Sequence, residues 1–172
     1  MIRLRTLGGF GLYLDGADST ASSVRPRVLA LLALLAGHRP GLSRDKLLAY
    51  LWPDSDTAHA RNSLKQALFS LRRVVARPMV VSASGLLRLD PSEVDVDLWG
   101  LEAALANGQE SQAVRLYRGP FLDGFYVTGL MEFEHWAEAE RERLIDLVRD
   151  WADQTIHTAR DPDPAHQKSS AS

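Results

Sequence analysis

The 172-residue sequence contains no cysteine. This absence excludes disulfide bonds, thiol catalysis, and zinc or iron–sulfur sites that depend on cysteine ligands. The sequence also lacks a long hydrophobic run: the longest apolar stretch, at 28–36, is far too short to span a bilayer. Residues 1–16 alternate apolar and polar types and lack the apolar block of a secretory signal. We therefore expect a protein without a membrane span, located in the cytoplasm.

Catalytic and metal-binding motifs are missing as well. The sequence holds no GxxxxGK[ST] phosphate loop, no GxSxG elbow and no HExxH zinc motif. The histidines lack the spacing of metal ligands; they are His38, His59, His135, His157 and His166. We therefore predict a binding protein and not an enzyme, with no cofactor and no metal site.

The net charge of −2 hides an uneven distribution. Residues 25–77 hold ten Lys or Arg against three Asp, which leaves +7, whereas residues 78–172 hold eight basic against seventeen acidic residues, which leaves −9. A basic middle suits a polyanion, and an acidic end would be repelled by one. We therefore expect two surfaces with different partners.

One amphipathic helix, predicted at 57–76, has two faces of opposite chemistry. Leucine or valine recurs every three or four residues on one face and predicts a stripe packed on a core; these residues are Leu64, Leu68, Leu71 and Val75. The other face holds Arg61, Asn62, Lys65, Gln66, Arg72 and Arg73. Such side chains suit the phosphates and base edges of a DNA major groove, although a solvated face in an unrelated bundle has the same pattern.

The elements before this helix help to choose between those alternatives. Alternating apolar residues predict two short antiparallel strands across Gly8–Gly9, and a weak pattern at 17–23 suggests a third. A helix that is apolar on most sides is predicted at 25–37. Ser43 then caps a second helix, in which Trp52 is expected to face the core rather than to stack on a base.

After the amphipathic helix, apolar runs at 79–81 and 86–89 flank a small tip and predict a hairpin. Strands, three helices and a closing hairpin form an α+β winged helix-turn-helix, in which the third helix enters the groove and the hairpin is the wing. The base-contacting candidates are Arg61, Asn62, Lys65 and Gln66. The phosphate-binding candidates are Arg25, Arg27, Ser43, Arg44, Lys46, His59, Arg72 and Arg73, and the wing candidates are Ser82, Ser84 and Gly85.

The remainder of the sequence predicts an all-α region. Residues 94–97 are interpreted as a linker, and short helices at 98–107 and 109–118 are expected to interlock as in a helical repeat. A long helix is predicted from about 130 to 158, with acidic residues at every fourth position that form either a solvated face or an interaction surface. The composition of 161–172 predicts a disordered tail.

Four segments, in this order, carry a resemblance to a known family: RPRVLALLALLAG, LSRDKLLAYLWPDSDTAHARNSLKQALFSLRR, VDVDLWGLEAAL and AVRLYRGPFLDGF. Together they resemble the amino-terminal part of the SARP family of bacterial transcriptional activators. The resemblance implies an OmpR-like winged-helix DNA-binding domain at 1–92. At 93–160 it implies part of a bacterial transcriptional activation domain (BTAD) built from TPR-like helix pairs. A complete BTAD has further helices, so we expect the first repeat and the start of the second, in a truncated piece or a short natural variant.

The resemblance also implies a function. SARP proteins bind direct promoter repeats in double-stranded DNA as head-to-tail dimers and recruit RNA polymerase, and their third helix lies in the groove. Trp151 and Ile156, expected to be exposed on the long helix, suggest a homodimer through that helix. The alternative is a protein-interaction adaptor that keeps the winged-helix fold, does not bind DNA, and holds its partner through the acidic helical part.

Overall fold

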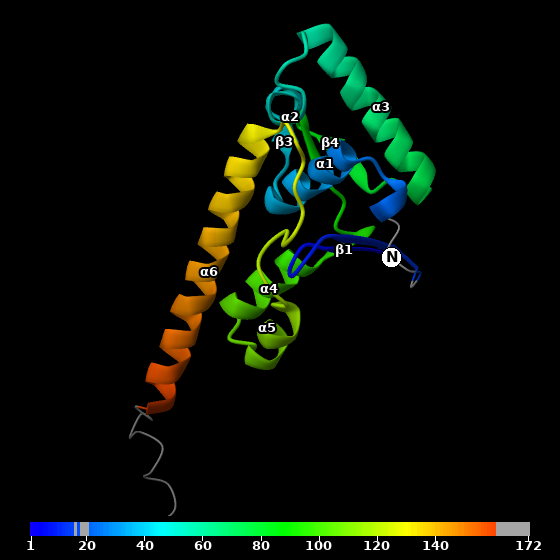
Figure 1. Ribbon diagram of the computed structural model, residues 1–172. Coiled ribbons are helices and arrows are strands. Elements are labelled where there is room, and N and C mark those ends of the chain that lie inside the picture. Colours follow the sequence, from blue (N-terminus) through cyan, green and yellow to red (C-terminus); the bar gives the residue numbers. More distant parts are fainter. Residues whose placement is uncertain (16, 18–20, 161–172) are drawn as a thin grey trace, which may run out of the picture.

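The computed structural model describes residues 1–15, 17 and 21–160 (Figure 1). The tail predicted at 161–172 lies outside the described residues, as do residues 18–20 of the third strand predicted at 17–23. Ala21–Ser23, in the described part of that segment, form a 3-10 helix, η1. No helix in the described ranges is both long enough and apolar enough to cross a membrane.

The first sheet combines the beginning of the chain with a strand from its middle. Strand β1 (Ile2–Arg5) pairs antiparallel with β2 (Gly11–Leu14), as the alternating residues predict. Strand β6 (Val94–Val96) pairs parallel with the other edge of β1, so the order is β2-β1-β6. The sheet is therefore mixed, whereas the sequence predicted only antiparallel strands.

The prediction of a linker at 94–97 was wrong. Val94 and Val96 are buried on either side of exposed Asp95, which is the two-residue period of a strand. Buried residues on both sides of this segment belong to one continuous hydrophobic core. The domain boundary predicted between residues 92 and 93 falls immediately before this strand of the first sheet. It stays a prediction.

Helix α1 (Pro26–Gly37) lies at the centre of the core. All residues at 28–36 are buried, as expected for a helix with apolar residues on most sides. The C-terminal end of α1 touches the last helix. A Cβ added at Gly37 would overlap the ring of Trp136 at Cζ2, so this close packing leaves no space for a larger residue.

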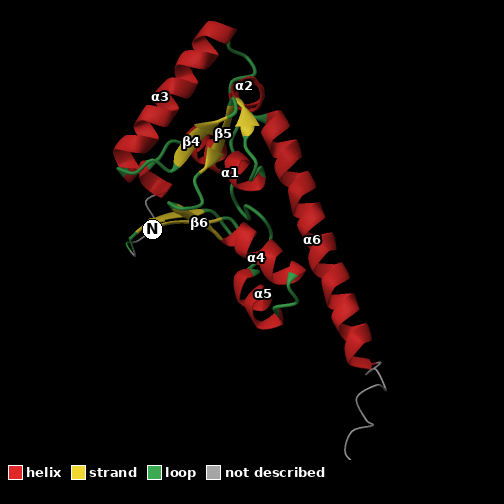
Figure 2. Cartoon of the chain, turned by 180° about the vertical axis from the view of Figure 1, so that it is seen from behind, coloured by secondary structure: helices red, strands yellow, loops and turns green. Residues whose placement is uncertain are grey.

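Helices α2 (Arg44–Leu51) and α3 (Thr57–Val75) pack on α1 and on each other. Trp52, directly after α2, is buried in the core as expected. A second sheet has the order β3-β5-β4. It consists of the predicted hairpin and a two-residue strand before α2; the strands are β3 (Leu42–Ser43), β4 (Val80–Ala83) and β5 (Leu86–Leu89). Figure 2 shows this sheet beside α1, with α3 on its outer side.

The remaining helices are α4 (Asp97–Ala106), α5 (Glu110–Leu116) and α6 (Met131–Arg160). Helices α4 and α5 pack on each other as the predicted pair. Figures 1 and 2 both show α6 running along the flank of the molecule and extending past α5. On α6, Trp151 is partly buried against the core, contrary to the expectation that it is exposed, whereas Ile156 is 51% exposed.

Asp97 joins the first sheet to α4. Its carboxylate accepts hydrogen bonds from the backbone N of Thr6 at 2.8 Å, from the Thr6 hydroxyl at 2.7 Å and from the backbone N of Leu7 at 3.0 Å. It also accepts from the backbone N of Leu98 at 2.9 Å, in the first turn of α4. Burial raises the pKa of the Asp97 carboxyl, although the donated hydrogen bonds act in the opposite direction.

An ion pair and several hydrogen bonds attach α6 to the body. Arg143 bridges Glu140 on α6 and Glu102 on α4, at 2.6 and 2.7 Å. Arg141 donates from Nε to the carbonyl oxygen of Phe121 at 2.7 Å. The acidic positions at every fourth residue are partly used within the fold, since Glu134 accepts a hydrogen bond from the backbone N of Val127 at 2.8 Å. Some of the acidic residues at every fourth position therefore support the fold and are not part of an interaction surface.

Candidate nucleic-acid interface

Helix α3 begins and ends where its sequence dictates. Asp56 is the N-cap, with a backbone in the extended region and a carboxylate that accepts from the backbone N of His59 at 2.9 Å. The C-cap residue, Ala76, adopts a left-handed conformation with φ 54°, which stops the helix. Arg72 and Arg73 lie in the last turn, where positive charge suits the helix dipole.

The buried stripe of α3 differs slightly from the predicted one. The buried residues are Ala60, Leu64, Ala67, Leu71 and Val75. Leu68, predicted to share this stripe, is only partly buried. Ala60 and Ala67 complete the buried stripe instead, and Leu68 faces the hairpin, where it lines a cavity with Val80 and Leu87.

The opposite side of α3 is exposed to solvent. We call it the outer face of α3; it consists of Arg61, Asn62, Lys65, Gln66, Phe69, Arg72 and Arg73, all of them exposed. The four predicted base-contacting residues and both arginines of the last turn therefore lie together on one face. Their role in binding DNA stays a prediction.

The start of α2 carries three predicted phosphate-binding residues. Ser43 is the N-cap, and its hydroxyl oxygen accepts from the backbone N of Lys46 at 3.2 Å. Arg44 and Lys46 are exposed in the first turn. Asp45 lies between them in the same turn. The helix start thus combines the positive end of the helix dipole with two basic side chains, an arrangement that suits an anion.

A cleft of about 440 Å³ separates α3 from the start of α1. Arg25 and Arg27 line one side of it, and Gln66 lines the other, together with Ser63 and Ser70 of α3. Arg25 is the N-cap residue of α1, and no side chain caps that helix. The cleft therefore brings two predicted phosphate-binding residues next to a predicted base-contacting residue.

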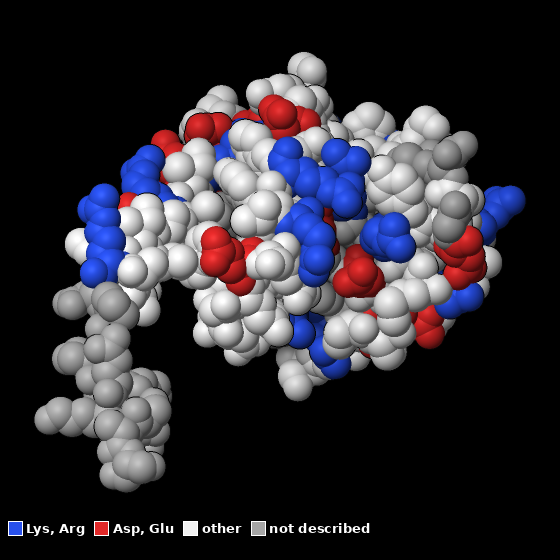
Figure 3. Space-filling view, turned by 90° about the horizontal axis from the view of Figure 1, so that it is seen from below, with Lys and Arg blue, Asp and Glu red and all other residues white. Residues whose placement is uncertain are grey.

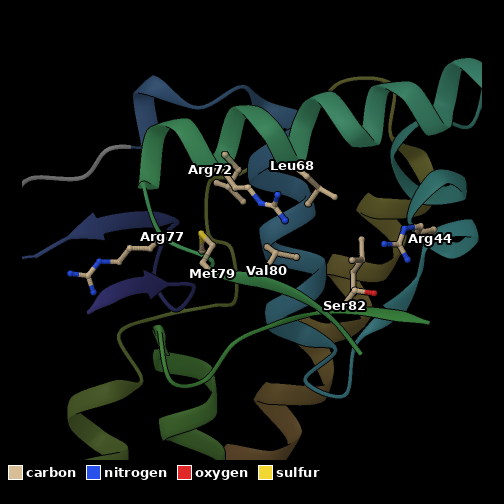
Figure 4. A pocket seen from close by; sticks show the side chains of 9 residues that line it. Arg44, Leu68, Arg72, Arg77, Met79, Val80 and Ser82 are labelled. Atoms are coloured by element: carbon tan, nitrogen blue, oxygen red, sulfur yellow. The ribbon is translucent and has the colours of Figure 1, made fainter. Parts of the chain in front are cut away.

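A smaller cavity of about 90 Å³ lies on the other flank of α3, next to the hairpin. Figure 4 shows Leu68 and Arg72 extending from α3 toward β4, with Arg44 and Ser82 near one end of the cavity. The start of α2, the last turns of α3 and the wing therefore meet at one place. Arg44, Arg72 and Ser82, separate in the sequence, form a single polar rim.

The wing tip is a two-residue turn. Ser84 and Gly85 have φ values of 52° and 77°, which is the backbone of a tight hairpin turn with two left-handed residues. Ser82, Ser84 and Gly85 are exposed. Nothing lies within 4 Å of a Cβ added at Gly85, so its side of the tip is open to a partner.

The basic residues of this region have no acidic partner in the part of the chain that the structure describes. Ion pairs among the described residues involve none of the predicted DNA-contacting arginines and lysines, which are Arg25, Arg27, Arg44, Lys46, Arg61, Lys65, Arg72 and Arg73. Arg77, just after α3, is different because it pairs with Asp15 at 3.3 Å. An unpaired positive surface attracts polyanions most strongly.

The face shown in Figure 3 has a different character. Basic and acidic side chains are interspersed on it. A cleft of about 480 Å³ between the first sheet and α5 likewise combines Arg3, Arg5 and Arg118 with Asp95 and Asp97. This cleft mixes charges of both signs, whereas the outer face of α3 holds no acidic residue, so the cleft is the weaker candidate for binding a polyanion.

His59, a predicted phosphate-binding residue, is paired with the N-cap. Its Nδ1 forms a short hydrogen bond with Oδ2 of Asp56. The bond and the charge of Asp56 raise the pKa of His59 above its ordinary value. The hydrogen bond from the His59 backbone N–H, followed by the side-chain bond, lowers the pKa of Asp56. His59 thus carries a positive charge at the start of α3 over a wider pH range than a free histidine does.

We expect the pKa of His59, followed by NMR through its ring protons, to lie above the ordinary value of 6.5. Since the folded-state pKa is raised, the stabilising contact is complete below the unfolded-state pKa and is lost as the pH rises through the folded-state pKa. Asp56→Asn, which keeps an N-cap side chain, is expected to return the pKa toward 6.5. An unchanged titration in this variant would show that Asp56 does not control His59.

Sequence reasoning missed three residues of this region. Ser63 and Ser70 line the cleft with Gln66, and their positions at intervals of three and four residues could have placed them on its flank. Phe69 lies on the outer face of α3, although its apolar side chain suggested no polar contact.

Among the described residues, no group of three or more His, Cys, Asp or Glu side chains could hold a metal ion.

Comparisons with known proteins give the class of this fold. No family model matches the sequence. An uncharacterized 47.3 kDa protein encoded in the thcA 5′ region of Rhodococcus erythropolis is 31% identical over 134 residues, which cover 76% of this chain and 28% of that protein. The structure of Mycobacterium tuberculosis EmbR, solved with a low-affinity phosphopeptide, superposes with a TM-score of 0.62 and 25% identity.

The EmbR superposition covers 92% of this chain and 46% of EmbR, so this chain spans less than half of each of these two proteins. EmbR is a SARP-family regulator. The chain therefore has a SARP-like, mixed α/β fold with small sheets and helices, and its likeness to EmbR suggests a transcriptional regulator.

Proposed function

We propose that the chain is a sequence-specific DNA-binding transcriptional regulator. The single observation that carries this proposal is the outer face of α3, where basic and amide side chains are exposed and have no acidic partner among the described residues. Side chains of this kind match the phosphates and base edges of a major groove. The likeness to EmbR supports the same class of protein.

In this proposal α3 lies in the major groove as the recognition helix. Arg61, Asn62, Lys65 and Gln66 contact base edges. One DNA strand runs past the cleft with Arg25 and Arg27, and the other runs past the rim formed by Arg44, Arg72 and Ser82. The wing tip contacts the adjacent groove, and protonated His59 adds positive charge at the start of α3.

The resemblance to SARP activators supports two finer proposals. The chain binds promoter repeats in pairs, as a homodimer on DNA, and it contacts RNA polymerase through its helical part. Exposed Ile156 on α6 is available for such contacts, as are Glu142 and Asp150, which form no ion pair among the described residues. Size-exclusion chromatography with light scattering, with and without a duplex that holds two sites, tests the first of these.

The experiment that tests the function is selection of bound duplexes from random DNA, followed by affinity measurements at several salt concentrations. About 6–10 phosphate contacts are expected to lower the affinity ~10³- to 10⁵-fold between 50 and 200 mM salt. Arg149→Ala, which removes an arginine paired with Asp146 on α6, is the control and should leave the salt dependence unchanged. Failure to enrich any duplex would contradict the proposal and favour the protein-interaction adaptor.

Substitutions separate base contacts from phosphate contacts. Arg61→Ala and Gln66→Ala are each expected to cost ~1–3 kcal/mol on the selected duplex and to relax base preference at one position. Lys46→Ala is expected to weaken all duplexes alike and to lower the salt slope by about one, because it contacts only phosphate. Equal losses on selected and random duplexes for Arg61→Ala would remove Arg61 from the base-contacting set.

A further inference from the structure

Phe69 is an apolar side chain in the middle of a polar surface. It is 64% exposed, and among the described residues it is the only large hydrophobic side chain on α3 with such exposure. Single exposed hydrophobic residues are common on protein surfaces. The position of this one distinguishes it, because every other residue of the outer face of α3 carries a charge or an amide.

Helical spacing places Phe69 at the centre of that face. Residues three or four positions apart are neighbours on a helix surface. Phe69 therefore has Lys65 and Gln66 on one side and Arg72 and Arg73 on the other. The Arg73 guanidinium carbon lies 6.0 Å from the centre of the Phe69 ring, so the ring is flanked by a cation and still open to solvent.

The chemistry of a major groove contains one group that such a ring recognises. Donors and acceptors cover most of the base edges, and the 5-methyl group of thymine is the apolar exception. Phenylalanine is among the side chains that contact this methyl group. A ring between Gln66 and Arg73 would meet a base edge while its polar neighbours contact adjacent bases and phosphates.

We propose that Phe69 contacts the 5-methyl group of a thymine and gives the chain a preference for thymine at one position of its site. This inference rests on the proposed DNA-binding function and adds a specificity-determining residue to it. Burial of one methyl group predicts a preference of about fourfold, which corresponds to ~0.8 kcal/mol. The preference concerns the methyl group alone, since uracil has the same hydrogen-bonding edge.

The test replaces each thymine of the selected duplex in turn with deoxyuridine and measures the affinity of the full chain. At one position the unmodified chain is expected to bind about fourfold more weakly without the methyl group. Phe69→Ala is expected to bind the thymine and uracil duplexes equally. Val114→Ala, a similarly exposed hydrophobic residue on α5, is the matched control and should keep the full difference. Circular dichroism melts check that both variants fold.

Each contrary outcome has a definite meaning. A selected duplex that shows no thymine–uracil difference at any position overturns the role of Phe69 and leaves DNA binding intact. The role of Phe69 is also overturned if Phe69→Ala keeps the thymine–uracil difference. It is overturned too if Phe69→Ala converts a dimer of the free protein to a monomer, because the ring then packs against a second copy of the chain. A chain that selects no duplex contradicts the DNA-binding function itself and the inference with it.

Discussion

Leu64→Ala is expected to lower the free energy of unfolding by ~2–5 kcal/mol. Leu64 is 3% exposed at the middle of the buried stripe of α3. Removing its side chain takes away apolar contacts and leaves a cavity that the surrounding helices fill only in part. Because a domain is stable by only about 5–15 kcal/mol, the midpoint of thermal or urea unfolding should fall clearly. Circular dichroism at 222 nm measures this change.

Leu68→Ala is the matched comparison, one turn further along the same helix. Leu68 is partly buried beside the hairpin, so its loss should cost clearly less than that of Leu64. Equal losses for the two leucines would mean that α3 is rotated relative to the arrangement described here. The outer face of α3 would then include different side chains.

Asp97→Ala is expected to have an effect of similar size at the junction of the first sheet and α4. The substitution leaves the backbone N–H groups of Thr6 and Leu7, both 0% exposed, without an acceptor. Each buried unsatisfied donor costs ~1–3 kcal/mol, so a loss of ~2–6 kcal/mol is expected. Urea unfolding measures it.

Two further variants separate the causes of this loss. Asp95→Ala removes an exposed carboxylate from the same segment and should change stability by no more than ~0.5 kcal/mol. Asp97→Asn keeps one acceptor oxygen and should fall between Asp97→Ala and the unchanged protein. If Asp97→Ala matched Asp95→Ala, the hydrogen bonds of Asp97 would not support the fold.

Local chemistry made much of the helical structure predictable from the sequence. Ser43 caps α2 through the backbone N of Lys46 because a hydroxyl at that position satisfies a free N–H group. The apolar run at 28–36 predicts a helix at the centre of the core, because no side of it suits water. All nine residues are buried. Exposure of Arg61 and Gln66 follows from the 3.6-residue period alone.

Features that depend on distant partners were not predictable in this way. Val94 and Val96 form too short an alternation to be distinguished from a linker until β1 is placed beside them. Leu68 and Leu64 have equal hydrophobicity, and the partial burial of Leu68 depends on where the hairpin packs beside it. The packing of the wing against α3 brings three residues to one cavity, Arg44, Arg72 and Ser82, and the sequence does not show this packing.

The parallel pairing of β1 with β6 has a consequence for the order of folding during synthesis. Ile2 lies opposite Val94, so the middle strand of the first sheet waits for a neighbour that is made much later in the chain. Contacts between such distant residues form slowly, because a long loop must close first. The smallest fragment that can complete this sheet therefore extends through Val96, and a fragment ending at residue 92 would present one edge of β1 to other chains.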